Sequence, residues 1–153
     1  MRTVRALLNV LEHDAREETV AQKRRLALVE RQEQAIRLNK PAELDAAVAE
    51  IERELEAQGP RDLRRLQALV ELSKHWGCDA RAMTLGSVAE RAGTDGAKLG
   101  VLRGELREAT SAVLRENRRL SALVRLHRQI VEDVLAGVVA GAGTDGRLVD
   151  AEA

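Results

Sequence analysis

The sequence predicts an all-α protein, an elongated antiparallel bundle of three long helices plus a short connecting helix. Three observations support this fold class. Ala, Leu, Arg and Glu dominate the composition, and all four favour helix. Phe and Tyr are absent and Trp occurs once, so the core must use Leu, Val and Ala, which suit narrow helix–helix seams. Apolar residues recur at spacings of three and four, and no segment shows the alternation of a strand.

The first predicted helix runs from about Thr3 to Leu38. Its apolar stripe consists of Val4, Leu8, Leu11, Ala15, Leu26, Val29 and Ile36. Glu18 and Gln22 occupy stripe positions in the middle, so we expect that stretch to be weakly held or to face a partner. Pro41 is well placed to open the next helix after a tight turn.

The second predicted helix extends from Pro41 to about His75. Its stripe comprises Leu44, Val48, Ile51 and Leu55, and its other face is acidic. Glycine weakens a helix, and proline disfavours helix in the residue before it. We therefore expect a kink or a short break at Gly59-Pro60.

Two loops and a short helix precede the third long helix. Thr84 is a suitable N-cap for the short helix, and Gly93 should end it. The third long helix is expected from about Ala97 to Ala140. Residues 1–140 then form a single helical domain, and the small, polar residues 141–153 form a mobile C-terminal tail.

Charge and apolarity exclude several classes of function. With 25 basic and 25 acidic residues, the chain has no net attraction for nucleic acid or for an anionic membrane. The Arg clusters are interleaved with acids and are interpreted as solvated helix faces. No apolar run is long enough to span a membrane, and the N-terminus lacks a secretory signal. A single Cys fits a reducing compartment, so we expect a cytoplasmic protein without nucleic-acid binding or membrane insertion.

Signatures of enzymes and cofactor binding are missing from the sequence. It has no phosphate-binding loop, dinucleotide fingerprint, zincin motif or serine-hydrolase elbow. We therefore expect no catalytic residues, no cofactor and no metal. One cluster has ligand-like spacing, namely Glu71, His75 and Cys78, with Asp79 as a possible fourth ligand. An ordinary helix end explains it more simply, and a metal-dependent or thiol enzyme is kept as a competing class.

The second half of the third long helix has more apolar surface than one seam requires. Excess apolar width near the end of a chain is typical of a partner-binding helix. The residues predicted to bind a partner are Leu120, Leu123, Val124, His127, Val131, Val134, Leu135 and Val138. The pattern alone fits equally well two neighbouring helices that cover this width. Because His127 lies on the stripe, we expect it to be a partly buried seam residue.

The order of these segments over roughly residues 4–140 resembles the FlgN family of flagellar export chaperones. The segments that carry the resemblance are LLNVLEHDAREE, LALVERQEQAIRLNKPAELDAAVAEIERELE, RDLRRLQALVEL and MTLGSVAERAG. The last is GELREATSAVLRENRRLSALVRLHRQIVEDVLAGV, in which the run from Asn117 to Leu120 is the most telling.

The resemblance implies a cytoplasmic, helical, non-enzymatic protein. Members of this family bind the hook–filament junction (hook-associated) proteins, prevent their premature assembly and deliver them to the flagellar type III export apparatus. The family's cargo surface corresponds by position to residues 120–139. Relatives often present a Tyr for docking at the export gate, but this chain has no Tyr, so no docking residue is assigned.

A structural coiled-coil protein that acts by homo-oligomerisation is the alternative function. The two functions differ in what covers the apolar residues 120–139: a cargo protein, or a second copy of the chain. The oligomeric state is left open. We also expect the second half of the third helix to be only partly ordered until a partner helix fixes it.

Overall fold

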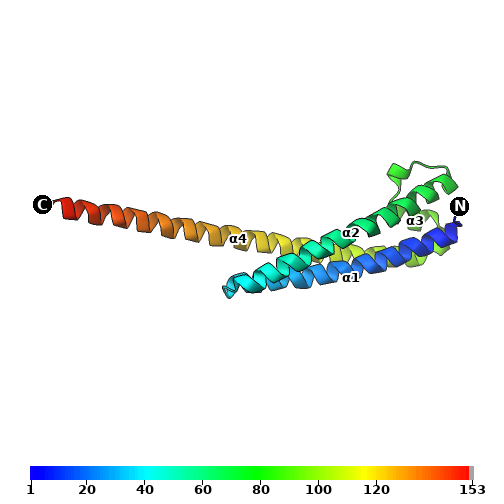
Figure 1. Ribbon diagram of the computed structural model, residues 1–153. Coiled ribbons are helices and arrows are strands. Elements are labelled where there is room, and N and C mark those ends of the chain that lie inside the picture. Colours follow the sequence, from blue (N-terminus) through cyan, green and yellow to red (C-terminus); the bar gives the residue numbers. More distant parts are fainter. Residues whose placement is uncertain (152–153) are drawn as a thin grey trace. The chain divides into compact units, whose positions relative to one another are not determined.

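The computed structural model describes the backbone of residues 1–151 and the side chains of residues 1–143. The described residues form four α-helices, which are α1 (Val4–Arg37), α2 (Pro41–Trp76), α3 (Leu85–Arg91) and α4 (Ala97–Ala151) (Figure 1). Two short 3-10 turns, Ala80–Ala82 and Gly93–Gly96, flank α3. The described residues contain no strand, so the prediction of an all-α fold is confirmed.

The helices differ greatly in length. α1 has 34 residues, α2 has 36, α3 has 7 and α4 has 55, so α4 is much longer than any other helix. The predicted end near Ala140 is wrong, because α4 continues to Ala151. Each glycine in this stretch costs a helix only about 1 kcal/mol, which does not stop it when no proline follows. The mobility predicted for residues 141–153 stays a prediction, and the last two of these residues lie outside the described part of the chain.

The chain divides into two compact units, Met1–Glu116 and Asn117–Ala153. The boundary between the two units falls within α4. The single predicted domain of residues 1–140 stays a prediction. The first unit contains α1, α2, α3 and the first part of α4. The second unit contains the distal part of α4.

The sequence signals for helix ends hold in the first unit. The Thr3 side chain caps α1 by accepting a hydrogen bond from the amide of Ala6 (3.2 Å). Asn39 has a positive φ of 51° in the tight turn, and Pro41 opens α2 as predicted. Thr84 and Ser87 form a reciprocal capping box at α3. Gly93, with φ 58°, follows α3 in the left-handed region that favours glycine.

α2 is continuous through Gly59-Pro60. Of the two expectations for this site, a kink or a short break, the break is therefore wrong. A proline inside a helix removes one hydrogen bond and crowds the preceding turn, at a cost of about 3 kcal/mol. Polar contacts to α1 hold α2 on both sides of Pro60. Gln58 accepts a hydrogen bond from Arg25 (2.7 Å), and Arg61 donates one to Glu18 (3.1 Å).

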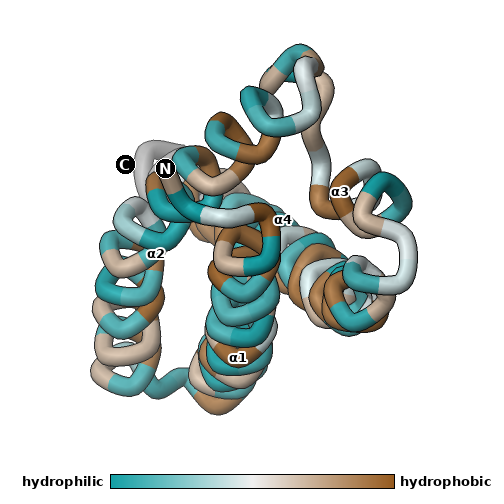
Figure 2. The backbone as a smooth tube through the Cα atoms, turned by 90° about the vertical axis from the view of Figure 1, so that its right-hand side faces the viewer, coloured by the Kyte–Doolittle hydropathy of each residue, from teal (hydrophilic) through white to brown (hydrophobic). Residues whose placement is uncertain are grey.

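An apolar core occupies one end of the first unit. Its members are Leu7, Leu8, Leu11, Ala68, Leu72, Met83, Val88 and Leu99. They come from α1, α2, the segment around α3 and the start of α4. Figure 2 shows α1 between α2 and the first part of α4, so α1 is the central helix of this unit.

Further along α1, the contact with α2 is polar. Glu18 and Gln22 are 4% and 8% exposed, so both are buried. The alternative from the sequence, that this stretch faces a partner, is therefore wrong. The Glu18 carboxylate accepts hydrogen bonds from Arg61 (3.1 Å) and from Gln22 (3.0 Å), and it lies 3.7 Å from Arg25. We call Asp14, Glu18, Gln22 and Arg25, with their partners on α2, the polar layer.

Asp14 and Glu12 connect the polar layer to the rest of the unit. Asp14 is 2% exposed and pairs with Arg65 (3.3 Å). Burial raises the pKa of the Asp14 carboxyl, although the positive charges of Arg65 and Arg64 oppose this shift. Glu12, also buried, pairs with Lys98 of α4 at 3.2 Å. One oxygen of Glu12 and one of Asp14 have no hydrogen-bond partner within the described residues, so desolvation in this region is only partly compensated.

The polar layer determines which face of α2 meets α1. Ala47 and Ala68 are fully buried, whereas Val48, Leu55 and Leu66 are 38%, 52% and 57% exposed. The polar residues of α2 lie roughly 90° around the helix from its apolar stripe, at about 100° per residue. Turning them towards the buried charges of α1 therefore turns the stripe outwards. Of the stripe predicted for the second helix, Val48 and Leu55 are therefore exposed, while Leu44 and Ile51 are half-buried.

Replacing Gly96 with Ala should destabilise the first unit. A Cβ atom at this position would overlap the backbone carbonyl of Ala89, which cannot move away as a flexible side chain can. We expect a loss of about 1–3 kcal/mol in the free energy of unfolding, measured by urea denaturation with Trp76 fluorescence. Gly100→Ala is the matched control, because its Cβ would sit 3.9 Å from the Cβ of Ala89. It should be neutral or stabilise by up to about 1 kcal/mol, and equal losses for both variants would contradict this packing.

Replacing Glu18 with Ala should cost about 3–5 kcal/mol of unfolding free energy, because it leaves two poorly exposed guanidinium groups without their shared carboxylate. Denaturation followed by far-UV circular dichroism measures the loss. Glu50→Ala is the control, since Glu50 pairs with Arg31 on the surface. Its cost should be below about 1 kcal/mol. If Glu18→Ala is as mild as the control, the polar layer does not hold α2 in place.

Candidate partner-binding surface

The predicted partner-binding residues lie along the distal part of α4. Val124, Val131, Val134, Leu135 and Val138 are 47%, 45%, 59%, 59% and 63% exposed. Leu120 and Leu123 are half-buried. His127 is exposed, so our expectation of a partly buried seam histidine is wrong. We call these eight residues the distal face of α4.

The spacing of the distal face makes it a continuous stripe. Six of the eight residues follow one another in steps that alternate between four and three, which keeps their side chains on one side of the helix; these are Leu120, Val124, His127, Val131, Val134 and Val138. Leu123 and Leu135 lie beside this line. The stripe covers about five turns, or roughly 27 Å. Ile130 and Val139, 52% and 72% exposed, extend it sideways. A helix with an exposed apolar stripe of this length is typical of surfaces that bind another helix.

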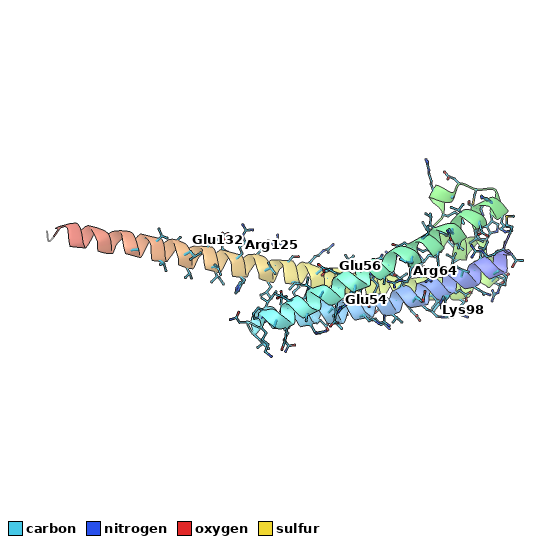
Figure 3. The ribbon with its side chains drawn as sticks, viewed as in Figure 1. Glu54, Glu56, Arg64, Lys98, Arg125 and Glu132 are labelled. Carbon is cyan, nitrogen blue, oxygen red and sulfur yellow. The ribbon has the colours of Figure 1, made fainter. Side chains whose placement is uncertain are left out.

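Polar side chains on the rest of this segment interact along the helix itself. Arg128 donates to Glu132 (2.9 Å), and Gln129 donates to Asp133 (3.0 Å). The Arg125 guanidinium donates to the carbonyl of Ser121 (3.3 Å). Arg125 and Glu132 are labelled in Figure 3. Each such pair adds a few tenths of a kcal/mol to an isolated helix, so the polar side supports the helix and leaves the apolar side available.

α2 presents a second exposed apolar surface, which the sequence analysis missed. Its exposed members are Val48, Leu55, Leu63 and Leu66, and we call them the outer face of α2. Asp45, Glu52 and Glu56 are exposed along the side of this face that is away from α1. Glu50 and Glu54 are engaged with α1 instead, in ion pairs with Arg31 (3.2 Å) and Arg24 (3.6 Å). Figure 3 labels Glu54 and Glu56.

The candidate metal cluster does not assemble. Glu71 pairs with Arg2 (2.6 Å), whose hydrogen bond lowers the pKa of the Glu71 carboxyl. His75 Nε2 lies 2.8 Å from the carbonyl oxygen of Arg2, and Cys78 Sγ lies 3.5 Å from Met83 Sδ. Among the side chains described, no three His, Cys, Asp or Glu residues are grouped so that they could hold a metal ion.

The basic cluster of α2 is paired with acids of α1. Arg61 pairs with Glu18, Arg64 with Glu17, and Arg65 with Asp14. These contacts fit the interpretation of the cluster as part of a charged helix face. Within the described part of the chain, no helix is both long enough and apolar enough to cross a membrane.

Comparisons with protein-family models, with curated proteins and with solved structures find no match. The resemblance to the FlgN family therefore depends on the quoted segments alone. The structure supplies a separate observation, namely where apolar side chains remain exposed on α4 and α2.

Proposed function

We propose that this protein is a cytoplasmic export chaperone of the FlgN type. In this proposal the distal face of α4 binds an amphipathic helix of a hook-associated protein. Binding prevents premature assembly of that cargo, and the chaperone delivers it to the flagellar type III export apparatus. The observation that carries the proposal is the continuous exposed apolar stripe from Leu120 to Val138.

The proposed architecture is an elongated antiparallel bundle of three long helices. In it, the first part of α4 packs in the bundle and the distal part binds the cargo. Leu99, Leu102 and Val113 in its first part are buried, which supports a place for that part in the bundle. From Val124 onwards its apolar side chains are exposed, which supports a role outside the core. One helix can thus join a stable base to a binding surface.

The size of the distal face suits reversible binding. If a cargo helix buries about 600 Å² of apolar surface, the gross gain is roughly 15 kcal/mol at about 25 cal/mol per Å². Loss of translational freedom and ordering of side chains offset most of this gain. The remainder corresponds to dissociation constants between about micromolar and nanomolar, a range compatible with a chaperone that must later release its cargo.

The second candidate function is a structural coiled-coil protein that acts by homo-oligomerisation. The heptad-like spacing of the distal face favours it, because the same spacing serves a seam between identical chains. A chaperone binds junction proteins in a defined ratio. A purely structural protein does not bind them.

The double substitution Val124→Asp with Val131→Asp should abolish cargo binding. Each carboxylate would be buried without a partner in the complex, at a cost of about 2 kcal/mol or more. Together they should weaken binding at least several-hundred-fold. Isothermal titration calorimetry with purified junction proteins of the source organism, tested one at a time, provides the measurement. Far-UV circular dichroism of the free variant should be nearly unchanged, because both valines are exposed.

Leu126→Asp is the matched control. Leu126 is 58% exposed on the same helix but lies about 120° around it from the centre of the distal face, so its replacement should weaken binding much less than the double substitution. If the double variant unfolds, these valines belong to the core. If the unchanged protein binds none of the junction proteins, the proposed function is wrong.

A further inference from the structure

His127 is the one polar residue in the central line of the distal face. The rest of that line is Leu and Val, namely Leu120, Val124, Val131, Val134 and Val138. The positions one helical turn before and after His127 are also apolar; they are Leu123, Val124, Ile130 and Val131. A helix that packs on the distal face therefore covers the imidazole together with its apolar neighbours.

The imidazole of His127 has no carboxylate beside it on its own helix. The charged residues within two turns of it lie about 100° or more around the helix; they are Arg125, Arg128, Glu132 and Asp133. Arg128 donates to Glu132 (2.9 Å), and Asp133 accepts from Gln129 (3.0 Å). Residues 124–139 are all exposed, so no other helix in the described part of the chain covers His127. An imidazolium buried here by a partner helix therefore receives no opposite charge from α4.

Burial discriminates between the two protonation states of an imidazole. Moving an unpaired charge from water into an apolar environment costs far more free energy than moving a neutral polar group. A histidine in water titrates at about pH 6.5, so both states are accessible at ordinary pH. A helix that covers the distal face therefore favours the neutral imidazole of His127.

We propose that His127 makes cargo binding by the distal face depend on pH, because the cargo helix covers this residue only as the neutral imidazole. The inference rests on the proposed function, since it concerns the same surface. The protonated imidazole is favourable only in the free chaperone, so added protons shift the equilibrium towards the free state. Binding is then strongest above about pH 7 and weakens as the pH falls through about 6.5.

The same argument defines the residue of the cargo helix that lies opposite His127. An Asp or Glu there would pair with the imidazolium, and binding would strengthen at low pH. An apolar residue leaves the imidazolium unpaired, and it matches the apolar neighbours of His127 on the distal face. The cargo helix of this proposal is therefore apolar at that position.

Isothermal titration calorimetry with the purified junction proteins, at pH 7.5 and at pH 5.5, tests the proposal. For the unchanged protein the dissociation constant should be about tenfold higher at pH 5.5, the value for one histidine that binds only when neutral. For His127→Leu the two dissociation constants should differ by less than about twofold. His127→Gln keeps a polar side chain that does not titrate, and it should behave as the Leu variant does.

The comparison between variants isolates His127 from other titrating groups. Titrating groups of the cargo are the same in every experiment. The Asp14 carboxyl, whose pKa burial raises, is likewise present in every variant. His13→Gln is the matched control, because His13 lies in the first unit, 3.6 Å from Glu17. It should retain the tenfold difference between the two pH values.

Three results would overturn the proposal. The first is an equal effect of pH on the unchanged protein and on His127→Leu. The second is tighter binding at pH 5.5 that disappears in His127→Leu, since it would place a carboxylate of the cargo opposite His127. The third is an absence of binding by the unchanged protein at pH 7.5, which contradicts the proposed function itself. The first two results leave the proposed function intact, so the two failures are distinguishable.

Discussion

The buried carboxylate of Glu18 is the constraint on which the arrangement of the first unit depends. A charge removed from water must be paired, and Glu18 finds its partners in Arg25 of α1 and Arg61 of α2. To supply Arg61, α2 turns a polar side towards α1. Val48, Leu55, Leu63 and Leu66 of α2 then remain exposed, and the largest apolar cluster lies at the end of the unit near Leu8, Leu72 and Val88. The polar layer thus costs hydrophobic burial and defines how the two helices face each other.

Much of the helical framework was predictable from local signals. Pro41, Thr84 and Gly93 act through their own backbone geometry, and the structure places helix boundaries where they indicate. The rotation of α2 was not predictable in this way. An apolar stripe shows which face of a helix is apolar, but the neighbouring helix decides whether that face is buried. The continuity at Pro60 and the extension beyond Ala140 likewise depend on the sum of contacts along each helix and not on a single residue.

The candidate surface was predictable to the same extent. The excess apolar width of α4 pointed to residues 120–138, and most of these side chains are exposed. His127 was misplaced, because a position on the stripe was taken as a position in a seam. The outer face of α2 was missed because the apolar stripe that contains Val48 and Leu55 does not by itself show whether it is buried. Both errors have one cause. The periodicity of a helix shows which of its faces is apolar, but it does not show whether another helix covers that face.

Hydrogen exchange tests most directly the central claim that the distal half of α4 lies outside the core and is completed by a partner. At a concentration at which the protein is monomeric, amides of α1 around Leu8 and Leu11 should exchange slowly, whereas amides of residues 117–140 should exchange near the rate of an isolated helix. A bound partner should slow exchange in residues 117–140 alone. Protection of residues 117–140 equal to that of α1 in the free monomer would contradict the account.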